Sequence, residues 1–555
     1  MSTSGYTGQP IIILKEGTER SQGSDARNAN IMAARVVSNV LKSSLGPKGM
    51  DKMLVTSFGD VTITNDGATM LKEMDIQHPA AKMMVEIAET QDDEVGDGTT
   101  SVVVLAGELL GKAVDLMDKK VHPTVIIDGY RDAQEQALKY LEEMAIDVDP
   151  RDKETLKKVA MTSMASKLIS GHSDLIADLA VDSVLQIAEE SEGRFEADLD
   201  MVKVEKKPGG SLTDTTMVRG LVIDKEIVHS DMPKLVRDAK IGLLNAAMEI
   251  KKTEFSSKIQ IDSPEEIQAY LDQEENILRD MVKKVKDAGV NVLFCQKGID
   301  DMVQHFLARE GILAARRLKE GDMEALAKAT GGKVVNSIDE LTDDDTGYAA
   351  KVEERKMGDD KMIFVEGCRN PKAVSILIRG GTERIVDEAE RSLHDALCVV
   401  RDVVEEPRIV AGGGAPEIEV ARRLRRYAEG LVGRERLAVS AFAEALEVIP
   451  LTLAENSGMD PIDALSGMQL RHEKGELWVG LDSLKGEVAD MTELDVYEPI
   501  QVKAQAIKSA TEAATMLLKI DDVIAASKMK MPSGPEGAGG MPGLPGGMPG
   551  GMPPM

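Results

Sequence analysis

The segment Gly96-Asp97-Gly98-Thr99-Thr100-Ser101 most constrains what this chain can fold into. It lies between two helical patterns, and residues 102–116 after it repeat apolar residues at helical spacing. The segment therefore begins a helix, where unpaired N–H groups and the helix dipole favour an anion. A carboxylate, glycines and hydroxyls at that place can surround one phosphate. The alternative is that Asp97 only caps the helix and the glycines form a tight turn.

Length and charge limit the classes of protein. A chain of 555 residues is too long for one core, so we expect more than one domain. Its 67 basic and 96 acidic residues give a net charge of −29, which argues against a nucleic-acid binder or an anionic-membrane binder. We find no apolar run of about 18 residues and predict no membrane span. Cys295, Cys368 and Cys398 lie far apart without metal-site spacing, which favours a reducing, cytoplasmic location.

The N-terminal part reads as mostly helical. A helix is expected over residues 25–41, followed by two short strands at 51–55 and 61–64 and a turn at Asn65-Asp66-Gly67. Helices are predicted over most of residues 79–141. The phosphate-binding candidate therefore lies within a helical domain.

The middle of the chain changes to alternating short apolar runs and helices, which predicts a compact α/β domain over roughly 217–370. Strands are expected at 202–205, 290–296, 312–316 and 333–335, and helices at 299–309 and 323–329. A capping box at Ser263-Pro264-Glu265-Glu266 begins another helix. That helix either packs on its own domain, which the sequence alone slightly favours, or protrudes as an arm that meets another molecule.

Helices are also predicted to dominate the C-terminal part. A long amphipathic helix covers residues 382–405, and a glycine-rich stretch at 411–415 precedes a helix that begins at Pro416. One strand is expected at 477–479. Residues 531–555 are rich in Gly, Pro and Met and are predicted to be disordered.

Five motifs carry a family resemblance. They are Leu45-Gly46-Pro47-Lys48-Gly49, Asn65-Asp66-Gly67-Ala68-Thr69, residues 96–101, Val400-Arg401-Asp402 and Ala411-Gly412-Gly413-Gly414. Each motif alone is weak, and the chain has neither a Walker A motif nor the kinase signatures. Together, in this order and spacing, they resemble the group II chaperonins, above all the archaeal thermosome, over essentially the whole chain.

The resemblance implies a multidomain, α-rich α+β fold. An equatorial ATP-binding domain would comprise residues 1–149 and 406–555. A small intermediate domain would comprise 150–217 and 370–405. An α/β apical domain would occupy 218–369, with a helical lid arm at about 245–285.

The resemblance also implies roles for single residues. Asp97 would hold Mg²⁺, and Asp66 and Asp402 would orient and polarise the attacking water. Lys167 would sense the γ-phosphate of ATP, and Glu498 would bond the ribose. The other nucleotide-binding candidates are Leu45, Gly46, Pro47, Gly98, Thr99, Thr100, Ser101, Ser166, Gly413, Asp482 and Lys503.

Each of these residues also has a plainer explanation. Asp66 can be only a turn former, and Asp402 can be a solvated helix residue among charged neighbours. Lys167 can be a surface lysine, and Glu498 an ordinary loop residue. The joint match of motifs favours the functional roles.

The implied function is an ATP-dependent chaperone. Two stacked rings, eight-fold and built from one or several subunit types, would enclose non-native proteins under a built-in lid, without a separate lid co-chaperonin. Phe255, Ile259 and Ile261 are candidates for the lid tip or for client contact. The alternative is a ring that only holds clients, without productive ATP turnover. A small-molecule kinase lacks any acceptor-binding motif.

Overall fold

The computed structural model describes residues 19–56, 59, 61–167, 170–191, 193–250, 264–358, 360–370 and 372–525. The chain divides into two units, residues 1–29 with 520–555 and residues 30–519. Phe255, Ile259, Ile261 and the predicted disordered tail, residues 531–555, lie outside the described residues.

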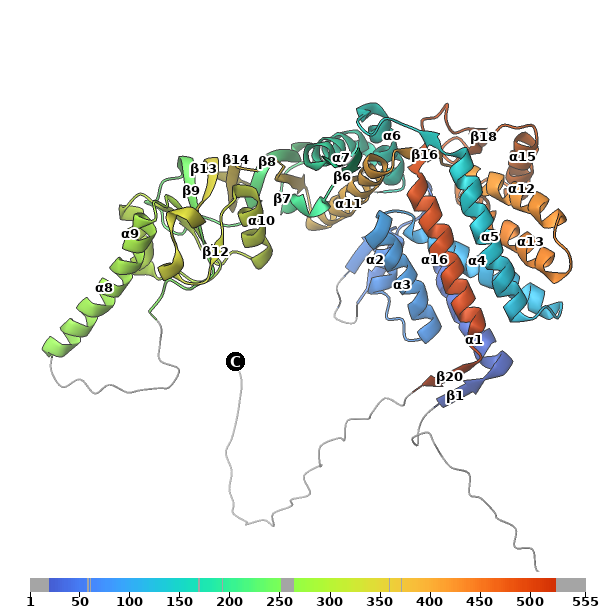
Figure 1. Cartoon of the computed structure of the whole chain (residues 1–555), viewed down its shortest axis with the longest axis horizontal. Helices are drawn as coiled ribbons and strands as arrows, with labels where there is room; N and C mark the ends of the chain where they lie inside the picture. Colours follow the sequence, from blue (N-terminus) through green and yellow to red (C-terminus); the bar gives the residue numbers. More distant parts are fainter. Residues whose placement is uncertain are drawn as a thin grey trace, which may run out of the picture. The chain divides into compact units, whose positions relative to one another are not determined.

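The first unit pairs a segment near the N-terminus with a segment near the C-terminus. In it, β1 (Glu19–Gln22) pairs antiparallel with β20 (Asp522–Ala525), as Figure 1 shows. The backbone N–H of Gly23 donates to Asp521 O at 2.6 Å. Helix α1 (Gly23–Lys42) begins here and continues into the second unit.

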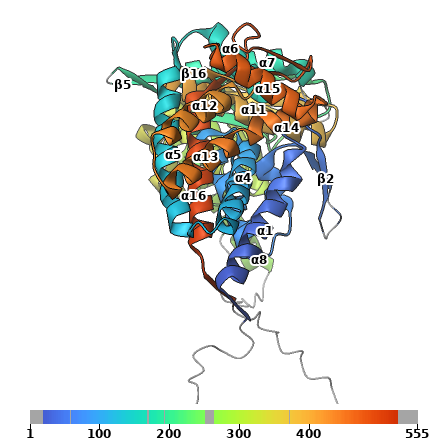
Figure 2. The same ribbon diagram turned by 90° about the vertical axis from the view of Figure 1, so that its right-hand side faces the viewer.

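Helices from both ends of the chain build one part of the second unit. Helix α16, near the C-terminus, packs against α4 and α5, which come from the N-terminal part (Figure 1). The buried rings of Tyr130 and Phe442 meet edge to face at 5.6 Å and join α5 to α13. Figure 2 shows this group from the side. Its helices are α2 (Gly67–Glu73), α3 (Pro79–Val95), α4 (Thr99–Asp118), α5 (Pro123–Met144), α12 (Ala415–Glu429), α13 (Arg434–Leu446), α14 (Val448–Ser457), α15 (Pro461–Glu473) and α16 (Ile500–Lys519).

One stretch departs from the expectation that no apolar run is long enough to span a membrane. Among the described residues, the helical stretch Arg434–Ser457, which contains α13 and α14, has the length and composition of a span. However, 78% of its most apolar window is buried inside the protein. Both helices contribute to the hydrophobic core, and a core helix meets the same criteria.

Short hairpins and a small sheet accompany the helices of the second unit. The hairpin expected at 51–55 and 61–64 is confirmed, whereas the strand expected at 477–479 begins only at Val479. The pairs are β2 (Lys52–Val55) with β3 (Val61–Thr64), β5 (Glu189–Ser191) with β6 (Arg194–Glu196), and β17 (Val479–Asp482) with β18 (Glu487–Asp490). A three-stranded sheet has the order β19 (Tyr497–Pro499), β16 (Arg408–Ala411), β4 (Ile146–Asp147).

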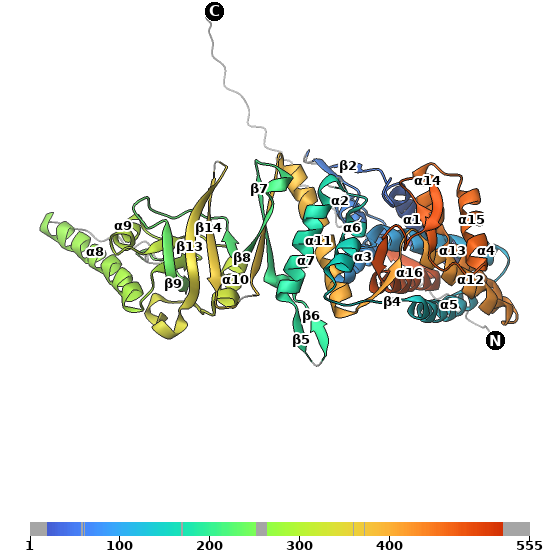
Figure 3. The same cartoon turned by 90° about the horizontal axis from the view of Figure 1, so that it is seen from above.

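Three helices, α6 (Lys153–Met164), α7 (Ser173–Ile187) and α11 (Glu383–Glu405), pack on one another and share a core with β7 and β15. Thr382 caps α11 by accepting from the N–H of Ile385, which places its start where the sequence predicted. Figure 3 shows this layer beside the sheet.

A nine-stranded mixed sheet forms the α/β part, in the order β11-β10-β9-β13-β14-β8-β15-β7, with β12 also paired to β9. The strands expected near 292, 313 and 334 and the helices near 301 and 323 are confirmed. The strands are β7 (Val202–Pro208), β8 (Thr216–Ile223), β9 (Leu235–Leu244), β10 (Val292–Cys295), β11 (Leu313–Ala315), β12 (Val334–Val335), β13 (Gly347–Met357), β14 (Asp360–Cys368) and β15 (Val374–Gly380). The helices are α8 (Pro264–Asp287), α9 (Asp301–Arg309) and α10 (Glu320–Thr330).

Strand β8 changes partner in its middle. Residues 216–219 pair with β15, and residues 220–223 pair with β14. At the change Gly220 has φ +143°, and a side chain there would collide with Val365 O. The predicted boundary near 217 therefore falls inside a hydrogen-bonded strand, whereas the one near 370 falls in the connection between β14 and β15, and the three-domain division stays a prediction.

Candidate nucleotide site

A pocket of about 830 Å³ lies in the second unit and collects its walls from segments far apart in the sequence. All the predicted site residues except Asp402 and the three arm residues outside the described ranges line it. They are Leu45, Gly46, Pro47, Asp66, Asp97, Gly98, Thr99, Thr100, Ser101, Ser166, Lys167, Gly413, Asp482, Glu498 and Lys503.

The N-terminus of α4 opens into this pocket. Its N-cap is Gly98, with φ 79° and no side-chain cap. The carboxylate of Asp97 accepts from the N–H of Gly98 at 2.6 Å, one residue too early to cap the helix. The first-turn N–H groups and the hydroxyls of Thr99 and Thr100 thus lie where a phosphate would sit. The simple capping role considered for Asp97 does not describe this geometry.

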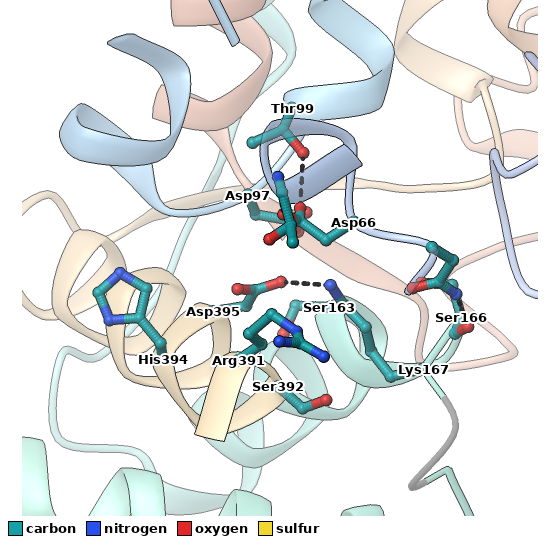
Figure 4. A network of polar contacts seen from close by, with 12 residues as sticks. Asp66, Asp97, Thr99, Ser163, Ser166, Lys167, Arg391, Ser392, His394 and Asp395 are labelled. Carbon is teal, nitrogen blue, oxygen red and sulfur yellow. Dashed lines mark hydrogen bonds and ion pairs between the residues drawn. The ribbon is translucent and has the colours of Figure 1, made fainter. Parts of the chain in front are cut away.

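Asp66 serves two purposes. Its carboxylate caps α2 by accepting from Thr69 N at 2.7 Å, so the predicted turn at Asn65-Asp66-Gly67 is a helix start. It also accepts from the hydroxyl of Thr99 at 3.0 Å and faces the pocket (Figure 4). Burial raises the pKa of Asp66, but the Lys167 ammonium and the hydrogen bonds from Thr69 and Thr99 outweigh burial and lower it. Asp66 is therefore an ionised carboxylate.

A buried ion pair forms the opposite wall. Lys167 Nζ lies 2.9 Å from Asp395 Oδ2, and both side chains are more than nine-tenths buried. Figure 4 shows the pair facing Asp66 and Asp97 across the pocket. Burial lowers the pKa of Lys167, but Asp395 and Asp66 outweigh it and raise the pKa. Lys167 is thus a buried cation rather than the surface lysine considered from sequence.

Asp402 lies elsewhere. It is 1% exposed, it does not line the pocket, and its carboxylate Oδ1 accepts from Arg401 Nη2 at 2.8 Å. Burial raises the pKa of Asp402 to about 7 against the lowering effect of Arg401. Asp395, about two helical turns earlier on α11, occupies the position expected for Asp402. Of these two carboxyl groups, only that of Asp395 lines the pocket, and the water-orienting role stays a prediction.

Asp97 fits a metal that is held jointly with a nucleotide. Burial raises its pKa, although the Gly98 N–H and Lys167 lower it. Among the described residues, no group of three or more His, Cys, Asp or Glu residues could hold a metal. Mg²⁺ is commonly bound by one or two carboxylates together with substrate phosphates, so a single pocket carboxylate beside a phosphate cradle suits this ion.

The phosphate side of the pocket also includes the loop at 45–47. Asn456 fixes this loop by donating to Leu45 O at 2.8 Å and to Lys42 O at 2.9 Å. Gly46 has φ +83°, and a side chain there would collide with Leu453. Gly46 therefore allows the loop to pack closely against Leu453 of α14.

The other end of the pocket suits a nucleoside. Apolar Ile449, Leu481 and Met491 line it, and a Cβ at Gly413 would lie 2.6 Å from Met491 Sδ. Asp482 holds its own loop by accepting from the N–H groups of Leu484 and Lys485, each at 3.0 Å.

A buried cluster of charges adjoins the nucleoside end. Lys503 Nζ lies 2.7 Å from Glu498 and 2.9 Å from Glu417. Burial raises the pKa of Glu498, although Lys503 lowers it.

Sequence reasoning missed the contribution of α6. Lys157, Lys158, Met161 and Thr162 line the pocket mouth, and Lys158 forms an ion pair with Asp495 at 2.9 Å. Nothing in the local pattern distinguishes these lysines from others on an exposed helix face. Asp395 was also missed, although the helix that carries it was predicted.

These features define a multidomain α/β protein with a pocket for a phosphorylated nucleoside. Residues 37–528 match the model of the TCP-1/cpn60 chaperonin family, and the chain belongs to this family. It is 57% identical over 522 residues to a thermosome subunit of Methanopyrus kandleri, covering 94% of this chain and 96% of that protein. It is 55% identical over 538 residues to the thermosome subunit beta of Archaeoglobus fulgidus, covering 97% and 99%.

A solved structure is similar as well. The open-state monomer of a group II chaperonin from Methanococcoides burtonii matches with a TM-score of 0.61 and 44% identity. The match covers 77% of this chain and 100% of that one. The predicted recognition as a group II chaperonin and the predicted fold class are confirmed.

Proposed function

We propose that the protein is an ATP-hydrolysing chaperonin subunit that couples ATP turnover to closure of a chamber around non-native proteins. The observation that carries the proposal is the convergence of Asp66, Asp97, Asp395 and Lys167 on the N-terminus of α4. Phosphoryl transfer requires positioning and charge stabilisation more than covalent catalysis, and these groups supply both.

The pocket residues divide the work between them. The first-turn N–H groups of α4, with Thr99, Thr100 and Ser101, bind the phosphates, and the backbone of Gly46 approaches them closely. Asp97 would hold Mg²⁺, which would neutralise charge developing on the phosphate oxygens. Ionised Asp66 and the Asp395 carboxyl, whose pKa burial raises against the lowering effect of Lys167, orient and polarise the attacking water, and Lys167 donates to the γ-phosphate.

The remaining residues orient the nucleoside. Gly413 lies against the nucleoside, and Asp482 holds the loop beside the base. Glu498 accepts hydrogen bonds from the ribose hydroxyls, and Lys503 donates to them. Ser166 accepts, through its backbone carbonyl, from Asn65 Nδ2, so the segment before Lys167 is tied to the start of α2.

The two walls belong to different predicted domains. Asp66 and Asp97 come from the equatorial segment, whereas Lys167 and Asp395 come from the intermediate one. Hydrolysis therefore requires that α6 and α11 close onto the phosphate cradle, which is catalysis gated by a conformational change.

The assembly belongs to the same proposal. Double rings with a built-in lid arm at about 245–285 would enclose clients, and a cytoplasmic location remains a prediction. On α8, within that arm, Tyr270 and Leu271 are 45% and 52% exposed, so apolar surface is available for clients or neighbouring arms.

Steady-state ATP hydrolysis by the assembled protein tests the proposal. We expect Mg²⁺-dependent turnover in the wild type and a loss of about 100-fold or more in Asp395→Asn, because the amide cannot polarise water. Refolding of a denatured client should follow turnover. Negligible hydrolysis in the wild type would instead indicate a ring that only holds clients, and unchanged hydrolysis in Asp395→Asn would remove that residue from the mechanism.

A further inference from the structure

Helix α11 is attached to the turn that carries Asp97. Arg401 donates from Nη2 to the backbone carbonyl of Glu94 at 2.6 Å, in the last turn of α3. Carbonyls in a last helical turn lack partners within the helix and carry partial negative charge, so a guanidinium is well matched to this position. Arg401 thus joins α11 to α3 three residues before Asp97.

A second contact lies one turn away on α11. Gly96 ends α3 with φ 65°, and a side chain on it would overlap Cys398. Cys398 and Arg401 are three apart and therefore share a helix face. Together they hold the turn from one side, while Gln91 Nε2 donates to Asp97 O at 2.9 Å from another.

Asp402 holds the guanidinium in place. Its Oδ1 accepts from Arg401 Nε at 3.1 Å and from Nη2 at 2.8 Å. The side chain is 1% exposed, and its Oδ2 has no hydrogen-bond partner within the described part of the chain. A carboxylate so deeply buried and bonded through one oxygen is explained by its hold on Arg401 rather than by contact with solvent.

Asp395 lies on the same helix. Seven residues separate it from Asp402, which corresponds to about 10 Å along the axis at ~1.5 Å per residue. One rigid element therefore carries a water-orienting carboxylate and, two turns later, the anchor to the turn of the metal-binding carboxylate.

We propose that Arg401, fixed by Asp402, is a positioning residue that keeps the Asp97 turn in register with Asp395. The inference rests on the proposed ATP hydrolysis. The Arg401 anchor sets the rate of hydrolysis and the Mg²⁺ concentration that turnover requires. It contributes little to nucleotide affinity. Asp402 acts through Arg401 and does not touch the attacking water.

Substitutions of Asp402 separate this role from a catalytic one. Asp402→Asn keeps an oxygen that accepts from Arg401, so we expect kcat within about threefold of wild type. Asp402→Ala and Arg401→Met remove the anchor and should lower kcat by about 10- to 100-fold, the loss that follows a small misplacement of reacting groups. Arg401→Lys, which can still donate to Glu94 O, should be intermediate.

Three other readouts accompany turnover. The Kd for ADP, measured by calorimetry, should stay within about threefold in all variants. In Arg401→Met and Asp402→Ala the Mg²⁺ concentration for half-maximal turnover should rise severalfold, and amide exchange at residues 96–98 should accelerate. Arg151→Met removes an arginine–carboxylate pair that does not line the pocket, with Glu190 at 3.2 Å, and serves as the matched control.

Each contrary result is informative. If Asp402→Asn loses as much turnover as Asp395→Asn, Asp402 acts on the water and the inference is wrong. If Arg401→Met keeps wild-type kcat, or if it loses ADP affinity and thermal stability together with turnover, Arg401 positions nothing specific to hydrolysis. A wild type without turnover would refute the proposed function itself, a result distinct from these.

Discussion

The pocket draws its walls from residues between 44 and 503, whereas the strands from β8 to β14 come from one uninterrupted stretch, residues 216–368. The pocket contains buried charges, including Lys167, Asp395 and Lys503. The sheet part is filled by aliphatic and aromatic side chains such as Leu243 and Phe294. The same chain thus accepts costly buried ions around the proposed phosphate site and packs apolar groups in the core of the sheet part.

The largest effect on stability and turnover should come from breaking the buried ion pair between Lys167 and Asp395. Lys167→Met leaves Asp395 buried without its cation, so we expect a loss of about 3–5 kcal/mol in the free energy of unfolding. ATP turnover should fall about 100-fold or more because a charge facing the phosphate is lost. Denaturant unfolding and steady-state hydrolysis measure the two quantities.

The double variant Lys167→Met with Asp395→Leu sharpens this result. An apolar pair of similar volume should recover most of the stability but none of the turnover. Recovery of hydrolysis in the double variant would show that the pair is structural.

A matched pair of truncations compares the two regions directly. Phe294 in β10 and Phe442 in α13 are both fully buried, and replacement of either by Ala should cost about 3–5 kcal/mol. Phe294→Ala should destabilise the sheet part and leave ADP affinity unchanged. Phe442→Ala should destabilise the helical part around the pocket and lower ADP affinity. Hydrogen exchange resolved by segment, together with calorimetry, checks this. Reduced ADP affinity in Phe294→Ala would mean that the two regions are not independent.

Acid stability should depend on Glu419, a fully buried carboxylate 3.1 Å from His472 Nδ1. Burial raises its pKa, but hydrogen bonds from His472, Arg422 and Arg423 lower the pKa to about 2. A depressed folded-state pKa stabilises the protein above the unfolded value of about 4.5 and loses that contribution as pH falls toward 2. The contribution is on the order of 2–3 kcal/mol.

Glu419→Gln should therefore flatten the fall in stability between about pH 5 and 3. Glu143→Gln, which removes the exposed partner of the same Arg423, should keep the wild-type slope. Equal slopes in wild type and Glu419→Gln would contradict the assignment. The measurement is the denaturation midpoint at each pH.

The smallest effect is expected at the pocket mouth. Lys158 and Asp495 are 37% and 55% exposed, so their ion pair should contribute only about 0.2–1 kcal/mol. Lys158→Glu should speed ADP release less than about fivefold, and salt should suppress the difference. The swap Lys158→Asp with Asp495→Lys should restore the rate, while Lys153→Ala, which breaks the α6 pair with Asp182, should not change it. If the charge-swapped variant still released ADP as fast as Lys158→Glu, the ion pair would not control the rate of release.

Much of the fold was predictable because its elements have continuous patterns. The helix expected at 382–405 is α11. Its apolar periodicity identifies the buried face, and the Thr382 cap identifies its first residue. The start of α2 was predicted as a turn because Asn-Asp-Gly is compatible with a turn and with a helix start. The structure identifies a helix start, in which Asp66 accepts from the N–H of Thr69 and from the hydroxyl of Thr99.

The sequence could not show that Asp395, rather than Asp402, lines the pocket. Asp395 and Asp402 are seven residues apart, about two turns, so they share one face and periodicity cannot separate them. The distinction depends on Lys167, which is remote in sequence and meets only Asp395. Long-range pairing of this kind leaves no local signature.

The dispersed origin of the pocket also orders events during synthesis. Glu498 and Lys503 precede and begin α16, which packs between helices made some 400 residues earlier. A growing chain on the ribosome can form most contacts within residues 216–368 before α16 is made, whereas residues 216–219 of β8 must also wait for β15. The nucleotide site can form only after α16 has been synthesised. Newly made subunits therefore acquire nucleotide binding only after this helix has joined α4 and α5.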